Sequence, residues 1–498
     1  MPNKTKRKAE FGDFQTPKAL ARDVCALLSK HGLRPKALLE PTCGLGRFLF
    51  AGLDQFKEVE QALGADINAQ YIQQTRTDLQ QRSDAEKVQL READFFVTDW
   101  GKMISELREP ILVLGNLPWV TNAHLSTLGS QNLPSKSNFQ NRNGLEAITG
   151  KANFDISEWM LIRLLEAMNG RQGTLAMICK STVARKTLLH GWKNKIALET
   201  SAIYRIDADL HFAAAVDAAL LVAHFKPGAY ELEAKVYSCL HGDSEIETVL
   251  GCEDATLLAD IAAYHRWKHL CGEEVVKWRS GIKHDCSKIM EVRKEGAKYR
   301  NGLGELVDLE DVYLFPMLKS SQVVRSGGNE YRYMIVPQRT MGCDTGEIEE
   351  RAPRTWSYLK AHAKLLNGRG STIYRNRPPF SVFGVGEYSF APWKVAISGF
   401  YKRLTFATIG PIEGKPVVLD DTSYFLPCRT QAQAEYLGSL LNSSTAQAFY
   451  KAFVFWDSKR PITAELLRRL DLRRLAKEDG SAGKFNRLFG EPERLLFV

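Results

Sequence analysis

Short apolar runs alternate with helical patterns along the N-terminal part of the chain, up to Phe225. The apolar runs ALLE (37–40), GADI (64–67), VQLREAD (88–94), ILVLGN (111–116) and TLAMICK (174–180) have the length and composition of strands. The first helical pattern opens at Thr16-Pro17, ends at Gly32 and places Leu20, Val24, Leu27 and Leu28 on one face. Strands that alternate with helices predict an α/β fold with a parallel sheet covered on both faces.

Two features end this pattern. The runs AIYRID (202–207) and DAALLVAHF (217–225) lie close together and predict an antiparallel hairpin that finishes the sheet. After residue 228 the pattern loosens into shorter strands, turns and helices such as TLLADIAAYHRWKHL (256–270), which is typical of a separate α+β domain. The sequence therefore predicts two domains, residues 1–228 and 229–498.

A long polar stretch without a clear period runs from Asn116 to Lys151. Polar segments of this length inside a compact domain are usually functional or disordered. We expect a lid beside the site at the end of ILVLGN.

Composition limits the class of protein. With 44% hydrophobic and 25% charged residues, the chain resembles an ordinary globular protein, and its apolar runs are too short to cross a bilayer. The N-terminal MPNKTKRKAE has no apolar centre of a signal peptide, so we expect a cytoplasmic protein without a membrane partner. The nine cysteines form no CxxC pair and no zinc-type cluster, which indicates reduced thiols and no metal site, even where Cys286 follows His284.

The charge is concentrated in one segment. The whole chain carries +9, and between Arg351 and Arg403 ten basic residues stand against one acid, Glu387, with aromatic residues between them. A solvated basic face is the simple interpretation, and contact with a phosphate backbone is the functional one. The candidate DNA-binding residues are Arg375, Arg377, Lys394, Lys402 and Arg403. The same two interpretations apply to Arg185-Lys186 and to FWDSKRP (455–461).

Four short pieces fall at the predicted carboxyl ends of strands, where open α/β sheets bind ligands. They are LEPTCGLGRFL with Glu40, Gly44 and Gly46, GADIN with Asp66, READFF with Asp94 and Phe95, and GNLPW with Asn116, Leu117, Pro118 and Trp119. Each also has an ordinary explanation, because tight turns need glycine, helix starts favour carboxylates and cores contain phenylalanine. Their order and spacing together favour a nucleotide-like cofactor beside a site that stacks a flat ring.

At these motifs the sequence resembles the S-adenosylmethionine-dependent amino-methyltransferases of DNA, specifically the N6-adenine class with a C-terminal recognition domain. The resemblance runs through FGDFQTP, LEPTCGLGRF, GADIN, ADFF, GNLPW and HFAAAVDAALLVAHF, and more loosely through WRSGIKHD, FPMLKSS and LLNSS. It implies a Rossmann-like class I methyltransferase sheet followed by an α+β DNA-recognition domain. It also implies S-adenosylmethionine as cofactor, double-stranded DNA as partner and a restriction-modification setting, with which a cognate restriction endonuclease is compatible.

The resemblance also implies residue roles. Thr16, Glu40 and the Gly44 to Gly46 turn would hold the methionine end of the cofactor, Asp66 its ribose, and Asp94 with Phe95 its adenine. Asn116 begins the family's Asn/Asp/Ser-Pro-Pro-aromatic motif, and Phe212 falls at the position of a second aromatic residue. Here Leu117 replaces the usual first proline, which preserves the backbone carbonyl and changes the rigidity of the loop.

The motif suggests how the chemistry works. The Asn116 side-chain oxygen and the Leu117 carbonyl would accept the two hydrogens of an aromatic amino group, so that its nitrogen lone pair can point at the methyl group. Trp119 and Phe212 would stack on an extruded base, although Phe212 is equally explicable as a core residue.

Several other activities use related features. Cytosine N4 can replace adenine N6, and protein glutamine methyltransferases share the motif but need no large basic domain. An inert specificity protein and a fused nuclease are the remaining alternatives, against which the intact motif and the lack of a nuclease cluster count.

Overall fold

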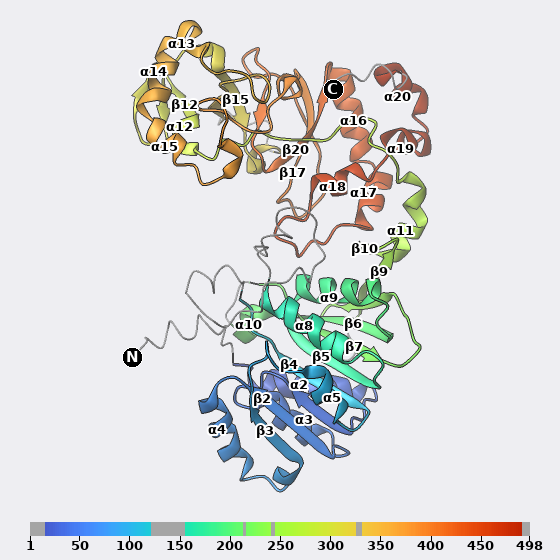
Figure 1. The fold of residues 1–498 in the computed structure, drawn as a ribbon. Coiled ribbons are helices and arrows are strands. Elements are labelled where there is room, and N and C mark those ends of the chain that lie inside the picture. Colours follow the sequence, from blue (N-terminus) through green and yellow to red (C-terminus); the bar gives the residue numbers. More distant parts are fainter. Residues whose placement is uncertain (1–14, 121–154, 213–215, 241–244, 325–330, 491–498) are drawn as a thin grey trace. The chain divides into compact units, whose positions relative to one another are not determined.

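The computed structural model describes residues 15–120, 155–212, 216–240, 245–324 and 331–490 (Figure 1). The chain divides into two compact units, Met1–Ile261 and Ala262–Val498. Each unit has its own sheets and its own core and is described by itself below.

Unit 1 is built on one ten-stranded sheet of order β10-β9-β8-β6-β7-β5-β4-β1-β2-β3. The five neighbouring strands β5, β4, β1, β2 and β3, which run to one edge of the sheet, are parallel, as the alternation of strands and helices predicted. The bounds of the strands are β1 Ala37–Glu40, β2 Gln61–Asp66, β3 Val88–Glu92, β4 Ile111–Asn116, β5 Gly173–Lys180, β6 Leu198–Ile206, β7 Ala218–Phe225, β8 Glu233–Tyr237, β9 Ile246–Glu253 and β10 Thr256–Leu258.

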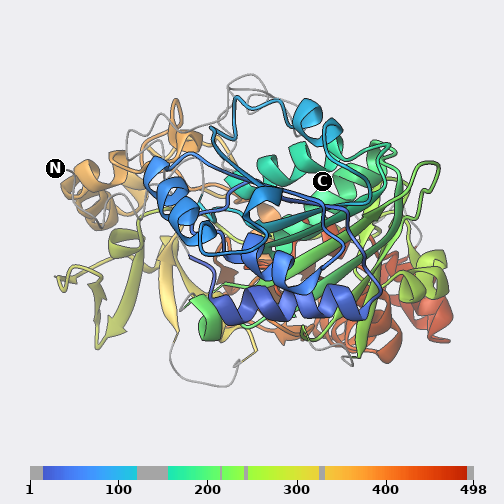
Figure 2. The ribbon, with the colours of Figure 1, turned by 90° about the horizontal axis from the view of Figure 1, so that it is seen from below.

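The predicted antiparallel hairpin is present, because β7 runs antiparallel to β6 and also to β5. It does not finish the sheet as expected, since β8, β9 and β10 extend the sheet beyond β6. Helices cover both faces of the sheet: α2 packs on α3, and α8 packs on α5 and α9 (Figure 2). The bounds of the helices are α2 Lys18–Lys30, α3 Arg47–Gln55, α4 Ala69–Leu79, α5 Trp100–Ser105, α8 Ile156–Ala167, α9 Ser181–Lys193 and α10 Ala208–Phe212.

The boundary between the units lies later than the sequence pattern predicted. We expected it at residue 228, and the structure places it after Ile261. The physical reason is that the first sheet continues: β8 pairs parallel with β6, and β9 and β10 add to β8. The segment that looked like the start of a second domain therefore completes the first.

Unit 2 is an α+β unit with a four-stranded sheet β11-β20-β17-β18 and a six-stranded sheet β14-β13-β12-β16-β15-β19. Its strands are β11 Arg279–Ser280, β12 Glu291–Glu295, β13 Lys298–Asn301, β14 Leu306–Val307, β15 Leu314–Leu318, β16 Arg332–Ile335, β17 Trp393–Ser398, β18 Ala407–Ile409, β19 Val418–Leu419 and β20 Ser423–Cys428. Apolar residues of the six-stranded sheet share a core with Tyr358 and Leu359, while α16 packs on β17, β18 and β20 (Figure 1).

The helices of unit 2 fall into two groups along the chain. The first group is α12 Ser287–Met290, α13 Ile348–Arg351, α14 Pro353–Ala361 and α15 Ala363–Asn367, and the second is α16 Gln431–Leu441, α17 Ser444–Lys451, α18 Ala464–Arg468, α19 Leu472–Glu478 and α20 Ala482–Phe489. Helix α11, Ile261–Trp267, begins at the boundary itself.

Candidate active site at the carboxyl edge of the sheet

The predicted cofactor and catalytic motifs meet at one edge of the first sheet. Glu40 ends β1, Asp66 ends β2 and Asn116 ends β4, and these three strands are parallel. Residues that end parallel strands lie at the same edge, which is where open α/β sheets bind their ligands. The structure thus brings together motifs that are far apart in the sequence.

A glycine turn after β1 approaches Asp66 closely. The Gly44 N–H donates to Oδ2 of Asp66 at 2.8 Å, and the Asn68 N–H donates to its Oδ1 at 2.8 Å. Gly46 has a φ of 66°, and a Cβ there would lie 2.8 Å from the Thr75 side chain, so both its backbone conformation and its neighbours require glycine. The turn and the Asp66 carboxylate form one rigid unit.

Glu40 is a buried carboxyl group, with 3% of its surface exposed. Its Oε2 accepts the Leu49 N–H at 2.8 Å near the start of α3. Burial raises the pKa of Glu40 well above its usual value, against the opposing effect of the backbone hydrogen bonds. A carboxylate in this environment would be stabilised by a cationic group of a ligand. The ammonium at the methionine end of S-adenosylmethionine is such a group.

Asp94 and Phe95 follow β3 and have different surroundings. The Asp94 Oδ1 accepts the Phe96 N–H at 2.8 Å, so the carboxylate holds the turn. The Phe95 ring is 5% exposed and lies 4.7 Å from the Trp100 ring, whose Nε1 donates to the Phe95 carbonyl. Phe96 is only half-buried, and sequence reasoning passed over it as a ring that could cover a ligand.

Asn116 is connected to two other segments of unit 1. Its Nδ2 donates to Thr16 Oγ1 at 3.4 Å, and its backbone carbonyl accepts the Thr42 hydroxyl at 3.3 Å. Leu117 is buried and Pro118 half-buried. These contacts bring Thr16, predicted as a cofactor ligand, next to the residue predicted to hold the amino group.

Trp119 is covered by Phe212 in this structure. The tryptophan is 7% exposed, belongs to the core cluster of unit 1 and lies edge-on to Phe212, with ring centroids 5.0 Å apart. The two aromatic side chains cover each other, which removes apolar surface from water. The structure does pair the two rings that the sequence placed on either side of a base.

The chain that leaves the motif is anchored to helix α8. The Ile156 N–H donates to the Val120 carbonyl at 2.9 Å. Asp155 caps α8 through the Ser157 N–H and pairs with Lys180, the last residue of β5, at 2.5 Å. These two contacts fasten both flanks of the 121–154 segment, and the predicted lid itself lies outside the described residues.

The basic pair Arg185-Lys186 lies on helix α9 in unit 1. Arg185 is 7% exposed, and the Lys186 ammonium pairs with Glu158 at 2.8 Å. The sequence was compatible with either a structural role or contact with a phosphate. These contacts favour the structural role.

Several cations of the basic segment 351–403 of unit 2 are engaged in contacts within the protein. Fewer of them can therefore bind a phosphate than the composition suggested. Ion pairs engage Arg351 with Glu347, Arg354 with Asp308 and Glu310, and Lys360 with Glu349. The Arg369 guanidinium donates to backbone carbonyls and lies 3.7 Å from the centre of the Tyr374 ring. The acids that balance this segment come from elsewhere in the chain.

Lys394, predicted as a DNA-binding residue, is corrected by the structure. It is 1% exposed in β17, its Nζ donates to the Ala391 carbonyl at 2.6 Å, and burial lowers its pKa to about 7. A side chain inside a sheet core cannot reach a phosphate. By contrast, Arg375, Arg377, Lys402 and Arg403 are exposed, and Lys402 donates to the carbonyls of Trp456 and Ser458 in FWDSKRP.

In the described ranges no group of His, Cys, Asp and Glu has the arrangement of a metal site. His284 instead pairs with Glu291 through Nε2 and accepts the Cys286 N–H at Nδ1. No helix in the described part of the chain is long and apolar enough to span a bilayer.

The parallel strands, the antiparallel strand β7 beside them and the glycine turn next to Asp66 define a class I methyltransferase, for which S-adenosylmethionine is the expected cofactor. The chain is 46% identical over 481 residues to the type II methyltransferase M.NspV of Nostoc sp., covering 95% of this chain and 99% of the relative. It therefore belongs to the type II methyltransferase family. No protein-family model matches the sequence.

A solved structure shares the fold over most of the chain. The type IIL restriction-modification enzyme MmeI, determined in complex with DNA, aligns with a TM-score of 0.54 at 13% identity. The alignment covers 91% of this chain and 64% of MmeI, so this chain spans less than two thirds of that enzyme. The likeness concerns the fold.

Proposed function

We propose that the protein transfers a methyl group from S-adenosylmethionine to N6 of an adenine in duplex DNA, at one recognition sequence, as part of a restriction-modification system. The observation that carries this proposal is the position of Asn116 at the end of β4, at the same sheet edge as Glu40 and Asp66. A cofactor site and an acceptor for amino hydrogens therefore adjoin each other.

The residues of the carboxyl edge fit the cofactor. Glu40 and Thr16 would face its methionine end, the Gly44 to Gly46 turn would let the backbone approach it, Asp66 would accept the ribose hydroxyls, and Asp94 with Phe95 would border the adenine. When bound, S-adenosylmethionine supplies a methyl group that its sulfonium makes electrophilic. The buried Glu40 carboxyl supports this placement because it offers a negative charge to a cationic ligand.

Asn116 and Leu117 would orient the acceptor. An aromatic amino nitrogen is a weak nucleophile because its lone pair is delocalised into the ring. The Asn116 side-chain oxygen and the Leu117 carbonyl would each accept one hydrogen of this group, which favours a pyramidal nitrogen with its lone pair directed at the methyl group. The contacts of Asn116 with Thr16 and Thr42 would hold it in place during the transfer.

Trp119 and Phe212 would hold the extruded base. Extrusion from the duplex costs a few kcal/mol, and stacking on flat rings offsets that cost. Because the two rings contact each other at 5.0 Å, a base can enter only if they separate. An aromatic pair is worth about 0.5–1.5 kcal/mol, so this opening is a small part of the cost of extrusion.

Unit 2 would bind the DNA outside the target base. Arg375, Arg377, Lys402 and Arg403 are exposed and belong to a segment that contains a single acid. The solved MmeI complex, in which an enzyme of the same fold binds DNA, also supports this role for the chain. A unit of this size distinguishes the proposal from a protein glutamine methyltransferase.

Modification-sensitive long-read sequencing tests the proposal. DNA from a methylation-free bacterial host that expresses the wild-type chain should carry N6-methyladenine at one motif, and DNA from the Asn116→Ala strain should carry none. Asn194→Ala is the matched control, because this exposed amide caps the far end of α9, away from the carboxyl edge. Purified Asn116→Ala protein should still bind S-adenosylmethionine within a few fold of wild type.

The other results are equally informative. N4-methylcytosine alone would keep the mechanism and replace the target base. Modification in the Asn116→Ala strain would overturn the role of Asn116. No modification from cofactor-binding wild-type protein would overturn the proposal in favour of a protein substrate or an inert specificity protein.

A further inference from the structure

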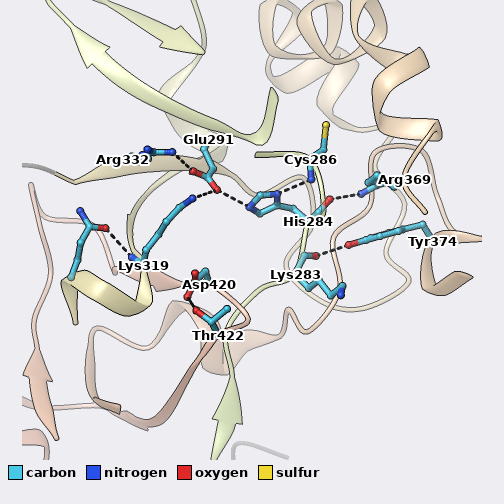
Figure 3. A network of polar contacts seen from close by, with 11 residues as sticks. Lys283, His284, Cys286, Glu291, Lys319, Arg332, Arg369, Tyr374, Asp420 and Thr422 are labelled. Atoms are coloured by element: carbon cyan, nitrogen blue, oxygen red, sulfur yellow. Dashed lines mark hydrogen bonds and ion pairs between the residues drawn. The ribbon is translucent and has the colours of Figure 1, made fainter. Parts of the chain in front are cut away.

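The segment 281–286 of unit 2 is held on several sides by other parts of the chain (Figure 3). Gly281 lies so close to the Asp420 carbonyl that an added Cβ would be 2.0 Å from it. The Ile282 N–H donates to the Leu419 carbonyl at 2.7 Å. Lys283 and Phe383 exchange two backbone hydrogen bonds, of 2.9 and 2.8 Å. The backbone of this segment is therefore fixed like a strand inside a sheet.

A network of polar contacts around the buried Glu291 fixes the next residue, His284. Its Nε2 pairs at 3.3 Å with Glu291, whose side chain is 2% exposed and also binds Lys319 at 2.7 Å and Arg332 at 2.6 Å. Despite the opposing effect of burial, the hydrogen bonds from His284, Lys319 and Arg332 lower the pKa of Glu291 to about 2. The His284 carbonyl accepts Arg369, and the Lys283 carbonyl accepts the Tyr374 hydroxyl (Figure 3). The imidazole thus belongs to the framework of the unit.

Three charged side chains remain at the surface of this rigid segment. The Lys283 ammonium lies 3.4 Å from Asp285 and 4.0 Å from Asp421, and the three side chains are 36%, 30% and 41% exposed. Asp285 has a φ of 51°, a left-handed conformation that the surrounding contacts must maintain. Exposed ion pairs at these distances contribute little to stability, so they can be exchanged for other contacts at small cost.

The surroundings of these three residues are cationic and aromatic. Arg375 follows Tyr374, whose hydroxyl binds the Lys283 carbonyl, and Arg460 donates to the Asp421 carbonyl at 2.8 Å. The Phe383 ring is 40% exposed next to Lys283, and Phe400, over which Arg460 lies, is 42% exposed. Cations beside exposed rings are typical of a surface that binds nucleic acid.

We propose that Lys283, Asp285 and Asp421 read the edge of one base pair, most simply a G·C pair, within the recognition sequence. This inference rests on the proposed function. A phosphate would be repelled by the two carboxylates, whereas a base edge offers both partners that the three residues need: guanine O6 and N7 accept from lysine, and cytosine N4 donates to a carboxylate. A rigid backbone is what discrimination requires, because a flexible side-chain cluster would adapt to a wrong base pair.

The test compares methylation of a panel of duplexes. The motif is first read from the genome of the expressing host, and each position is then changed in turn to the other three base pairs. For wild type, Lys283→Met, Asp285→Asn and Asp421→Asn, kcat/KM is measured on every duplex. Lys298→Met serves as the control, because Lys298 is an exposed lysine at the start of β13 in the same unit.

We expect discrimination to fall about tenfold or more at a single G·C position in the Lys283 and Asp285 variants, with the other positions unchanged. The control should keep the wild-type pattern. A uniform fall over all duplexes, including complete loss, would overturn the inference, because it indicates phosphate contact or a structural role. An unchanged pattern would overturn it as well. If the wild type methylates no motif, the proposed function itself fails, which is a distinct result.

Discussion

Among single residues, Glu40 is a buried ionisable residue at the expected cofactor site. Its carboxyl group is 3% exposed and its pKa is raised by burial. A buried charge without compensation is unfavourable, which is why burial raises the pKa of this carboxyl group. A cationic ligand would favour the carboxylate, and binding would then release a proton.

This linkage predicts a pH dependence of cofactor binding. As the pH falls below the raised pKa of Glu40, the affinity for S-adenosylmethionine should weaken by up to about tenfold per pH unit, because protonation competes with the ligand. Above that pKa the affinity should level off. Calorimetric titration across the neutral range measures this profile.

Glu40→Gln should flatten the profile, since the amide does not titrate. Glu92→Gln, a change at the exposed end of β3, should keep it. If the slope persists in Glu40→Gln, another group is responsible for it.

At the scale of secondary-structure elements, β17 contains a buried lysine. Lys394 lies between β18 and β20, where burial lowers its pKa from the usual 10.5 to about 7. The folded state therefore binds fewer protons than the unfolded state between these two pKa values. The strand tolerates the side chain in its neutral form, with Nζ donating to Ala391.

The sign of the effect follows from the lowered pKa. As the pH falls from about 10.5 towards 7, Lys394 should reduce the free energy of unfolding by about 1.4 kcal/mol per pH unit, with no further change below pH 7. Lys394→Met should remove this contribution, so that the variant gains stability relative to wild type at lower pH. Urea unfolding at a series of pH values measures the difference. Lys459→Met, a change at an exposed lysine, should follow wild type, and a constant difference between Lys394→Met and wild type would contradict the lowered pKa.

At the scale of the whole molecule, the distribution of charge matters more than its sum. The net charge is +9, yet several cations of the 351–403 segment are engaged by acids or carbonyls of unit 2. The exposed cations Arg375 and Arg377 remain the candidates for phosphate contact. Affinity that depends on phosphate contacts falls linearly with the logarithm of salt concentration.

A salt titration distinguishes the exposed arginines, which can contact phosphates, from the basic residues that are buried or engaged within the protein. The slope of log affinity against log salt should become shallower by about 2 in the Arg375→Gln, Arg377→Gln double variant, since each phosphate contact contributes about 0.9. Lys394→Met should keep the wild-type slope, because the ammonium is buried. Fluorescence anisotropy with a labelled duplex gives both slopes. Equal slopes in all three proteins would remove the arginines from the DNA interface.

Local patterns of the sequence determined much of unit 1. Alternating apolar runs are sufficient to predict parallel strands, and Gly44 and Gly46 predict the turn after β1 because a positive φ is a local property of the backbone. The resemblance of the motifs led to the methyltransferase family, and a relative with 46% identity confirms it. The β6–β7 hairpin followed from two adjacent apolar runs.

Tertiary structure decided what depends on distant neighbours. Whether Lys394 meets solvent or a sheet core depends on strands β18 and β20, and whether Trp119 is bare or covered depends on Phe212, nearly a hundred residues later in the chain. The extent of unit 1 depended on β8 pairing with β6. Nor do the residues of WRSGIKHD show that Glu291, Phe383 and Asp421 surround them. Side-chain burial and strand pairing are properties of the folded chain, because they depend on which distant segments come into contact. A local sequence pattern does not specify those contacts.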